Sequence, residues 1–324
     1  MRLAAMLATG TLCYSMATAP FDAGAASYPD RPIKWIVATS AGSLPDVLAR
    51  LIAERLSVSL GQPIIVEDRP GAGGTIGLSA VAKAPADGYT LGAISTTFLA
   101  TPSLIANVPY DTERDLSPIA VIAWNYALLV VRSNLPVHSI AELIAEAKSK
   151  PGILKYSSPG NGTPGHLWMK LFEQRTGTEF VHVPYKGAPA ATMGLLRGDV
   201  DVEVVGMLTL EDHVKSGAVR PLAAIAPRRL ASNPELPTIS ELGYSDLDLA
   251  DWQGVVAPAG TPSAVIERLS KELADIVAKP DIKERLQRFS MEPADVGPAE
   301  FKRLMHSEIQ RLKRLVREAN IKME

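Results

Sequence analysis

Residues 33–50 join a strand-like run to a helix-like run through a loop of small residues, and this unit constrains the fold most. Residues 33–37 form an apolar run of strand length. After the small-residue loop 39–43, Pro45 and Asp46 suit the first turn of a helix, where a missing N–H costs nothing and an acid complements the helix dipole. The pattern predicts an α/β fold whose first loop offers backbone N–H groups to a carboxylate or phosphate, although an ordinary strand-to-helix turn fits the same residues.

The alternation of strand and helix continues along the chain. It predicts a largely parallel sheet flanked by helices. The expected strands are residues 33–37, 64–67 and 90–94, then 154–157, 180–184, 200–205 and 220–226; the expected helices are 46–60, 75–84, 139–148, 166–175, 188–197, 262–278, 281–288 and 298–320. Ser139 with Glu142 forms a capping box, and Thr261 is the expected cap of the helix that follows it.

Two apolar stretches separate the chain into repeated α/β halves. Residues 119–131 are interrupted at 124–126, and a second such stretch begins near Trp252. We therefore expect two lobes joined by two crossover strands, with residues 27–124 plus 252–324 in lobe 1 and residues 125–251 in lobe 2. Two lobes with two connections favour a hinged receptor that closes on a small solute.

The first 26 residues have the layout of a cleaved secretory signal peptide. Arg2 precedes an apolar run that ends near small residues at 23–26. The only cysteine, Cys13, lies within it, so the mature chain would have neither disulfides nor thiol chemistry. Gly10 stands where a lipoprotein signal normally has leucine, which argues against lipidation. We expect a soluble protein outside the cytoplasm.

Charge and motif spacing disfavour several classes of function. Lys plus Arg number 33 and Asp plus Glu 35, so the chain lacks the basic excess of a nucleic-acid binder. The glycines at 71–77 miss the dinucleotide fingerprint because Ile76 takes the place of its last glycine. The five histidines show no metal-ligand spacing, so neither a metal nor another cofactor is expected.

A second loop, residues 157–165, repeats the design of the first between a strand and a helix. Its serines, Asn161 and Thr163 can donate hydrogen bonds to a ligand, and His166 follows just inside the helix. A Ser158–His166 hydrolase is the enzymatic alternative, but it lacks a third member and a nucleophile elbow. Lys186 follows the next strand and is either an anion contact or a plain surface lysine. Glu203, inside an apolar strand, would be costly without a partner.

The motifs YPDRPIKWIV, AGSLPDVLARLIAERL, GQPIIVEDRPGAGGTIG, VAKAPADGYTL, SSPGNGTPGHL, VHVPYKGAPAA and WQGVVAPAGTP occur in this order. In order and spacing the chain resembles the Bug-type substrate-binding receptors of tripartite tricarboxylate transporters, from Tyr28 to about Ile321. The resemblance implies a two-lobed type II periplasmic-binding fold. It also implies a periplasmic, non-catalytic receptor, expected to be monomeric, that delivers a small carboxylate to a membrane permease. A sensor of the same fold that signals to a membrane sensor kinase remains the alternative.

The resemblance also implies which residues bind the ligand. They are Thr39, Ser40, Ala41, Gly42, Ser43, Asp46, Ser95, Thr96, Thr97, Ser157, Ser158, Asn161, Gly162, Thr163 and Lys186. To these we add His166 from the second loop and Gly206 from the end of the late strand. Where members often show Phe-Asp-Asn, this chain has Val204, Val205 and Gly206, which implies a larger or more apolar distal pocket. We expect Trp124, Tyr126 and Trp252 to line that pocket around a bulky or aromatic group of the ligand.

Overall fold

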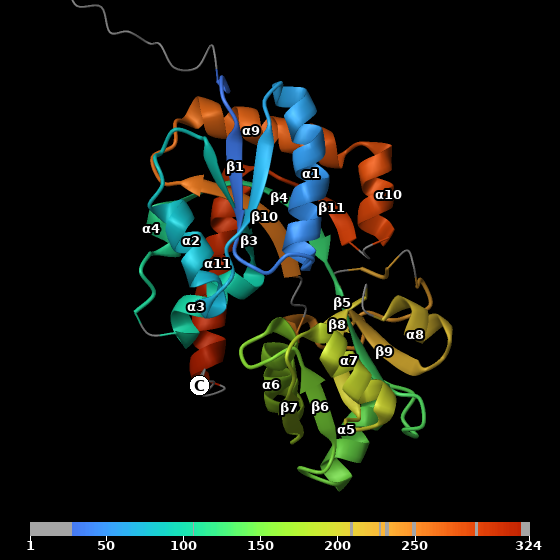
Figure 1. Cartoon of the computed structure of the whole chain (residues 1–324). Coiled ribbons are helices and arrows are strands. Elements are labelled where there is room, and N and C mark those ends of the chain that lie inside the picture. The colour runs from blue at the N-terminus through green and yellow to red at the C-terminus, as the bar shows by residue number, and fades with distance from the viewer. Residues whose placement is uncertain are drawn as a thin grey trace, which may run out of the picture.

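The computed structural model describes residues 28–105, 107–207, 210–226, 228–230, 233–247, 251–288 and 291–318. The predicted signal peptide lies outside these residues. Among the described helices, none is long and apolar enough to cross a membrane. Figure 1 shows two lobes, one above the other, with the chain passing between them.

The first lobe is built on a six-stranded sheet in the order β11-β4-β10-β3-β1-β2. Its strands are β1 (Ile33–Val37), β2 (Ile64–Asp68), β3 (Thr90–Ser95), β4 (Leu116–Asn125), β10 (Asp251–Pro258) and β11 (Met291–Val296). β1 pairs in parallel with β2 and β3, whereas β10 is antiparallel to β3 and β4, and β11 is antiparallel to β4.

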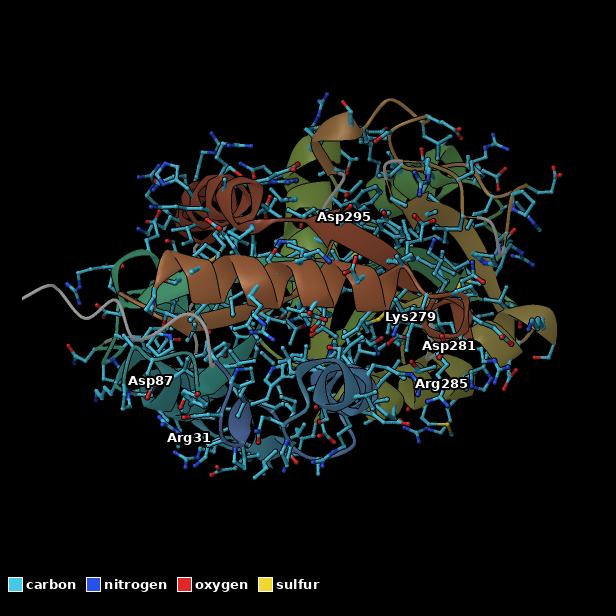
Figure 2. The ribbon with its side chains drawn as sticks, turned by 90° about the horizontal axis from the view of Figure 1, so that it is seen from above. Arg31, Asp87, Lys279, Asp281, Arg285 and Asp295 are labelled. Carbon is cyan, nitrogen blue, oxygen red and sulfur yellow. The ribbon has the colours of Figure 1, made fainter. Side chains whose placement is uncertain are left out.

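Helices cover both faces of this sheet. They are α1 (Leu44–Leu60), α2 (Thr75–Ala82), α3 (Thr96–Leu104), α4 (Thr112–Asp115), α9 (Ser263–Val277), α10 (Pro280–Arg288) and α11 (Pro298–Glu318). One hydrophobic core joins the sheet to α1, α9 and α10, and a second joins it to α2, α3 and α11. Figure 2, from above, shows α9 lying across the end of this lobe, with the Arg31–Asp87 ion pair (2.9 Å) on one side.

The second lobe is built on a five-stranded sheet in the order β7-β6-β8-β5-β9. Its strands are β5 (Ala127–Arg132), β6 (Lys155–Ser158), β7 (Val181–Pro184), β8 (Val202–Gly206) and β9 (Val219–Ile225). Its helices are α5 (Ile140–Ser149), α6 (Pro164–Thr176), α7 (Ala188–Arg197) and α8 (Glu211–Lys215). One core contains α5 and α6, and the other contains α7.

The two-lobed α/β fold is confirmed, but both sheets are mixed rather than largely parallel. In the second sheet β6 is parallel to β7 and β8, while β5 is antiparallel to β8 and β9. The antiparallel pairings arise where the chain changes lobes. β4 runs in the direction of β1 and β3 and leads into the second lobe, where β5 enters its sheet against the direction of β6 and β8. On the way back, β10 enters the first sheet against the direction of β3.

Most element boundaries agree with the sequence, and the exceptions are local. α1 and α6 each begin two residues earlier than expected, at Leu44 and Pro164. Ser139 accepts a hydrogen bond from the Glu142 N–H (3.1 Å), as a capping residue should. The Thr261 cap was wrong, because this hydroxyl donates to the Pro258 carbonyl within the preceding turn (2.8 Å). α3, α4, α8 and β11 were not predicted from the sequence.

The cleft between the lobes

Two cavities lie between the lobes, and both are lined by Leu44, Pro164 and Asp251. The larger, about 590 Å³, is lined mainly by the first lobe, and the smaller, about 230 Å³, mainly by the second. The larger is otherwise lined by Ala38, Thr39, Ser40, Ser43, Pro45, Pro70, Gly71, Gly73, Gly74, Ser95, Thr97, Phe98 and Gln253. The smaller is otherwise lined by Asn125, Ala127, Pro159, Gly165, Trp168, Ala188, Val204, Val205, Gly206 and Ile225.

The loop between β1 and α1 is held in shape by its own polar groups. The Thr39 and Ser43 hydroxyls are hydrogen-bonded to each other (2.6 Å). The Gly42 N–H donates to Oδ2 of Asp46 (2.8 Å), and Oδ1 of the same carboxylate pairs with Nε of Arg50 (2.6 Å). Ser43, the residue before the helix, makes no side-chain cap, so the first turn of α1 keeps N–H groups for a ligand.

The loop between β6 and α6 repeats this geometry in the second lobe. The Gly162 N–H donates to Nδ1 of His166 (3.0 Å), four residues on, as the Gly42 N–H donates to Asp46. The residue before the helix, Thr163, again makes no side-chain cap, and a proline again opens the helix. Since Leu44 and Pro164 line the same cavities, both helices begin at the cleft.

A stack of aromatic rings supports the second loop from beneath. The rings of His166 and His182 stack with centroids 4.0 Å apart, and Tyr156 stacks on His182 at 4.7 Å. Nε2 of His182 lies 2.7 Å from the Ser158 hydroxyl. Burial lowers the pKa of His166 to about 3 and that of His182 to about 4, so both imidazoles are neutral at physiological pH.

The structure brings part of the predicted site to the cleft. The predicted residues that line a cavity are Thr39, Ser40, Ser43, Ser95, Thr97 and Gly206. Those that line neither cavity are Ala41, Gly42, Asp46, Thr96, Ser157, Ser158, Asn161, Gly162, Thr163, His166 and Lys186. Asp46, Ser157, Ser158 and His166 are buried and stabilise the two loops, and their direct contact with a ligand stays a prediction. Lys186 is exposed.

The aromatic residues near the crossovers and the Ser158 hydroxyl have other neighbours than those considered from the sequence. Trp124, Tyr126 and Trp252 line neither cavity, and Trp252 is fully buried against Phe301, whereas Trp168 of α6 lines the smaller one. The Ser158 hydroxyl contacts His182 rather than His166, which removes the pair on which the hydrolase alternative rested.

Glu203 does not line the cleft. It is fully buried on β8, where Oε1 accepts a hydrogen bond from the Thr192 hydroxyl of α7 (3.2 Å). Burial raises its pKa to about 8, so this carboxyl group is largely protonated near neutral pH.

Asp251, the first residue of β10, lines both cavities and was missed in the sequence. Asn125 and Gln253 donate to its Oδ2 over 3.3 and 3.4 Å. Burial raises its pKa to about 6. The sequence did contain a signal for this residue: Asp251 directly precedes Trp252, where the apolar strand of the second crossover begins, so its charge must lie where the chain changes lobes.

Among the described residues, no group of three or more His, Cys, Asp or Glu could hold a metal ion.

The family model described as tripartite tricarboxylate transporter family receptor matches residues 48–321. The chain belongs to this family. Among its curated relatives is the protein BugT of Bordetella pertussis, 35% identical over 300 residues, which span 92% of either chain. A protein of Pseudomonas sp. strain P51, named for the tcbD-tcbE intergenic region, is 36% identical over 291 residues, covering 90% of this chain and 87% of the relative.

Several solved structures have the same fold. A protein of R. palustris, solved with adipate, is 34% identical with a TM-score of 0.80, and the match covers 91% of this chain and all of the other. MatC of Rhodopseudomonas palustris, with bound malate, is 27% identical with a TM-score of 0.76, covering 89% of this chain and all of the other. The periplasmic binding protein BugD is 30% identical with a TM-score of 0.77, covering 91% and all. The chain is therefore a solute-binding receptor of the tripartite tricarboxylate transporter family.

Proposed function

We propose that this receptor captures a small carboxylate-bearing solute between its lobes and delivers it to the membrane permease of a tripartite transporter. In this proposal the chain works in the periplasm as a monomer, after removal of residues 1–26, and it leaves its ligand chemically unchanged. The adipate and malate bound by its structural relatives support a carboxylate as ligand.

The observation that carries the proposal is the pair of helices that begin at the cleft. α1 and α6 start at Leu44 and Pro164, which line the same two cavities. The first N–H groups of a helix have no acceptor within it, and they carry the positive end of the helix dipole. A carboxylate between the two lobes would accept hydrogen bonds from both ends, and binding would then favour the closed arrangement.

The composition of the cleft makes the backbone the main source of positive potential. No lysine or arginine is among the described residues that line either cavity. The nearest guanidinium on α1, that of Arg50, is already paired with Asp46 (2.6 Å) and Asp68 (2.8 Å). A carboxylate would therefore be held by N–H groups and hydroxyls such as those of Thr39 and Ser43, not by an ion pair.

A substitution at Leu44 can separate the backbone N–H from the side chain. Leu44→Pro removes one N–H at a position where proline fits a helix, and Leu44→Ala removes the same side chain but keeps the N–H. A thermal-shift panel of malate, adipate, succinate, citrate and β-alanine selects the acid that stabilises the protein most, and titration calorimetry then measures its affinity. We expect Leu44→Pro to bind about tenfold more weakly than Leu44→Ala.

Equal affinities of the two variants would contradict the role of the α1 N–H groups. Failure of every acid to stabilise the unsubstituted receptor would contradict carboxylate capture itself. The transport step has its own test, because deletion of the receptor should abolish cellular uptake of the acid that it binds. Undiminished uptake in the deletion strain would contradict delivery to a permease.

A further inference from the structure

Asp251 is the only ionisable side chain among the described residues that line the two cavities of the cleft. It lies at the start of β10, where the second crossover re-enters the first lobe, and it belongs to the lining of both cavities. A ligand that spans the cleft therefore passes beside a carboxylate. In a site that receives anions, a lone negative side chain requires an explanation.

The Asp251 carboxylate is incompletely satisfied by the protein. Its Oδ1 is buried and accepts no hydrogen bond of normal geometry from the described residues. Its Oδ2 receives two long hydrogen bonds from the Asn125 and Gln253 amides, at 3.3 and 3.4 Å, and the backbone N–H groups of Thr96 and Trp252 also lie near the carboxylate. Because a buried charge without a partner is costly, a donor or cation that reaches this carboxylate would bind favourably.

Asp251 also changes what the start of α3 can bind. The Thr96 hydroxyl accepts a hydrogen bond from the Trp252 N–H (3.4 Å), so the end of β3 is joined to the start of β10. The backbone and hydroxyl of Thr96 lie close enough to Asp251 to stabilise its charged form. This helix start, one of the sites expected to hold a ligand carboxylate at residues 95–97, thus already has an anion beside it.

We propose that Asp251 makes the receptor selective for a carboxylate that carries a cationic nitrogen at its other end. The inference rests on the proposed function: the ligand carboxylate lies between the starts of α1 and α6, and the ammonium group lies against Asp251. A second carboxylate at that position would face Asp251 and be repelled. The selected class is therefore amino carboxylates, over dicarboxylates of the same length.

Matched pairs of ligands test this selectivity directly. β-Alanine and succinate, γ-aminobutyrate and glutarate, and δ-aminovalerate and adipate differ only in an ammonium group that replaces one carboxylate. Titration calorimetry at pH 7 compares the receptor with Asp251→Asn, which keeps the size of the side chain and removes its charge. Asp295→Asn is the matched control, since Asp295 is exposed on β11 of the first lobe, away from the cleft cavities.

In the unsubstituted receptor we expect at least one amino carboxylate to bind about tenfold or more tightly than its matched dicarboxylate. Asp251→Asn should reduce that ratio about tenfold or invert it, and Asp295→Asn should leave it unchanged. If Asp251→Asn leaves the ratio unchanged, or if every dicarboxylate binds more tightly than its partner, the role of Asp251 is overturned while carboxylate capture stands. Absence of binding by all six acids overturns the inference and counts against the proposed function as well.

The dependence on pH gives a second readout. The side chains that contact Asp251, namely Thr96 of α3, Asn125 of β4 and Gln253 of β10, are all uncharged, and no charged group shifts its pKa of about 6. Between pH 7 and pH 5, Glu203 with a pKa of about 8 stays protonated, and His166 and His182 stay neutral. Affinity for the amino carboxylate should fall about tenfold on going from pH 7 to pH 5. The same fall in Asp251→Asn would overturn the assignment.

Discussion

At the scale of single residues, burial of the Glu203 carboxyl group costs folding free energy when the group is charged. β8 places it in an apolar core with one hydrogen bond, from Thr192, while its Oε2 has no partner among the described residues. Folding therefore favours the protonated form, and the pKa rises from 4.5 in the ordinary state to about 8. In the unfolded chain the same carboxyl group would lose its proton near its ordinary pKa of 4.5.

This difference predicts a stability that falls as pH rises. The contribution of protonated Glu203 is fully present below about pH 4.5 and is lost as pH rises through about 8, with a slope of about 1.4 kcal/mol per pH unit between these limits. Urea unfolding at several pH values in this window should show that Glu203→Gln removes the slope. Glu235→Gln, at an exposed position, is the control and should retain it. Parallel curves for the two variants would contradict the protonated state of Glu203.

The buried histidines contribute a slope of opposite sign. Their pKa values of about 3 and 4 lie below the ordinary 6.5, so stability falls as pH drops from about 6.5 toward 4. For this reason the contribution of Glu203 is obtained as the difference between the unfolding free energies of Glu203→Gln and Glu235→Gln at each pH.

Residue roles were only partly predictable from the sequence. The small polar residues at 39–43 indicated a loop at a helix start, and Thr39, Ser40 and Ser43 do line the cleft. The partners of His166 and Ser158 depend on β7, which brings His182 across from a position 16 residues beyond His166. Asp251 was missed for a similar reason, because its neighbours Thr96 and Asn125 come from two other elements.

At the scale of elements, the placement of α6 depends on Gly165. A Cβ atom at this position would lie 2.4 Å from the Val204 carbonyl oxygen of β8, so only glycine lets the helix begin this close to the strand. The conflict is with backbone, which cannot turn aside as a side chain can. The start of α6, and with it the second half of the cleft, is therefore fixed by this contact.

Gly165→Ala should destabilise the protein by about 1–3 kcal/mol and weaken ligand binding, because α6 must move away from β8. Gly297→Ala is the matched control: its added Cβ would come no nearer than 3.9 Å to Ser270 Oγ. Thermal unfolding and calorimetry with the best-binding acid check both effects. A Gly165→Ala receptor as stable as Gly297→Ala would show that the helix start tolerates the shift.

Elements with strong periodicity or clear caps were predictable, and those shaped by tertiary contacts were not. α7 has the predicted bounds, and α1 ends at Leu60 before Gly61, whose φ of 68° suits glycine. α3 lacks an amphipathic pattern because it is covered on several sides by other elements, and Pro102 inside it argues against a helix in the sequence. β11 contains Pro293 and exists as a strand only through its pairing with β4.

At the scale of the whole molecule, the lobes are joined by more than the two crossovers. α11 belongs to the core of the first lobe, but Leu167 of α6 packs in that same core. Arg311 of α11 also donates to the Asp246 carbonyl of the second lobe (3.2 Å), and Arg228 pairs with Glu292 across the lobes. These contacts lie apart from the residues that line the cleft. Closure of the cleft would therefore be a rotation about the β4–β5 and β9–β10 connections with α11 as a support.

A spin-label experiment measures this rotation directly. α1 and α7 both begin at the cleft, with Leu44 and Ala188 in its lining, and both carry exposed apolar residues farther along, Val58 and Met193. Because Cys13 is the only cysteine and lies in the predicted signal peptide, Val58→Cys with Met193→Cys would allow spin labels to be attached to the mature chain at two defined sites.

Saturating ligand should shorten and narrow the distribution of distances measured by double electron–electron resonance, since a ligand held by both helix starts favours the closed state. Leu44→Pro in the same background should require more ligand for the same shortening. A distribution that does not change under a ligand that stabilises the protein would show that binding involves one lobe alone.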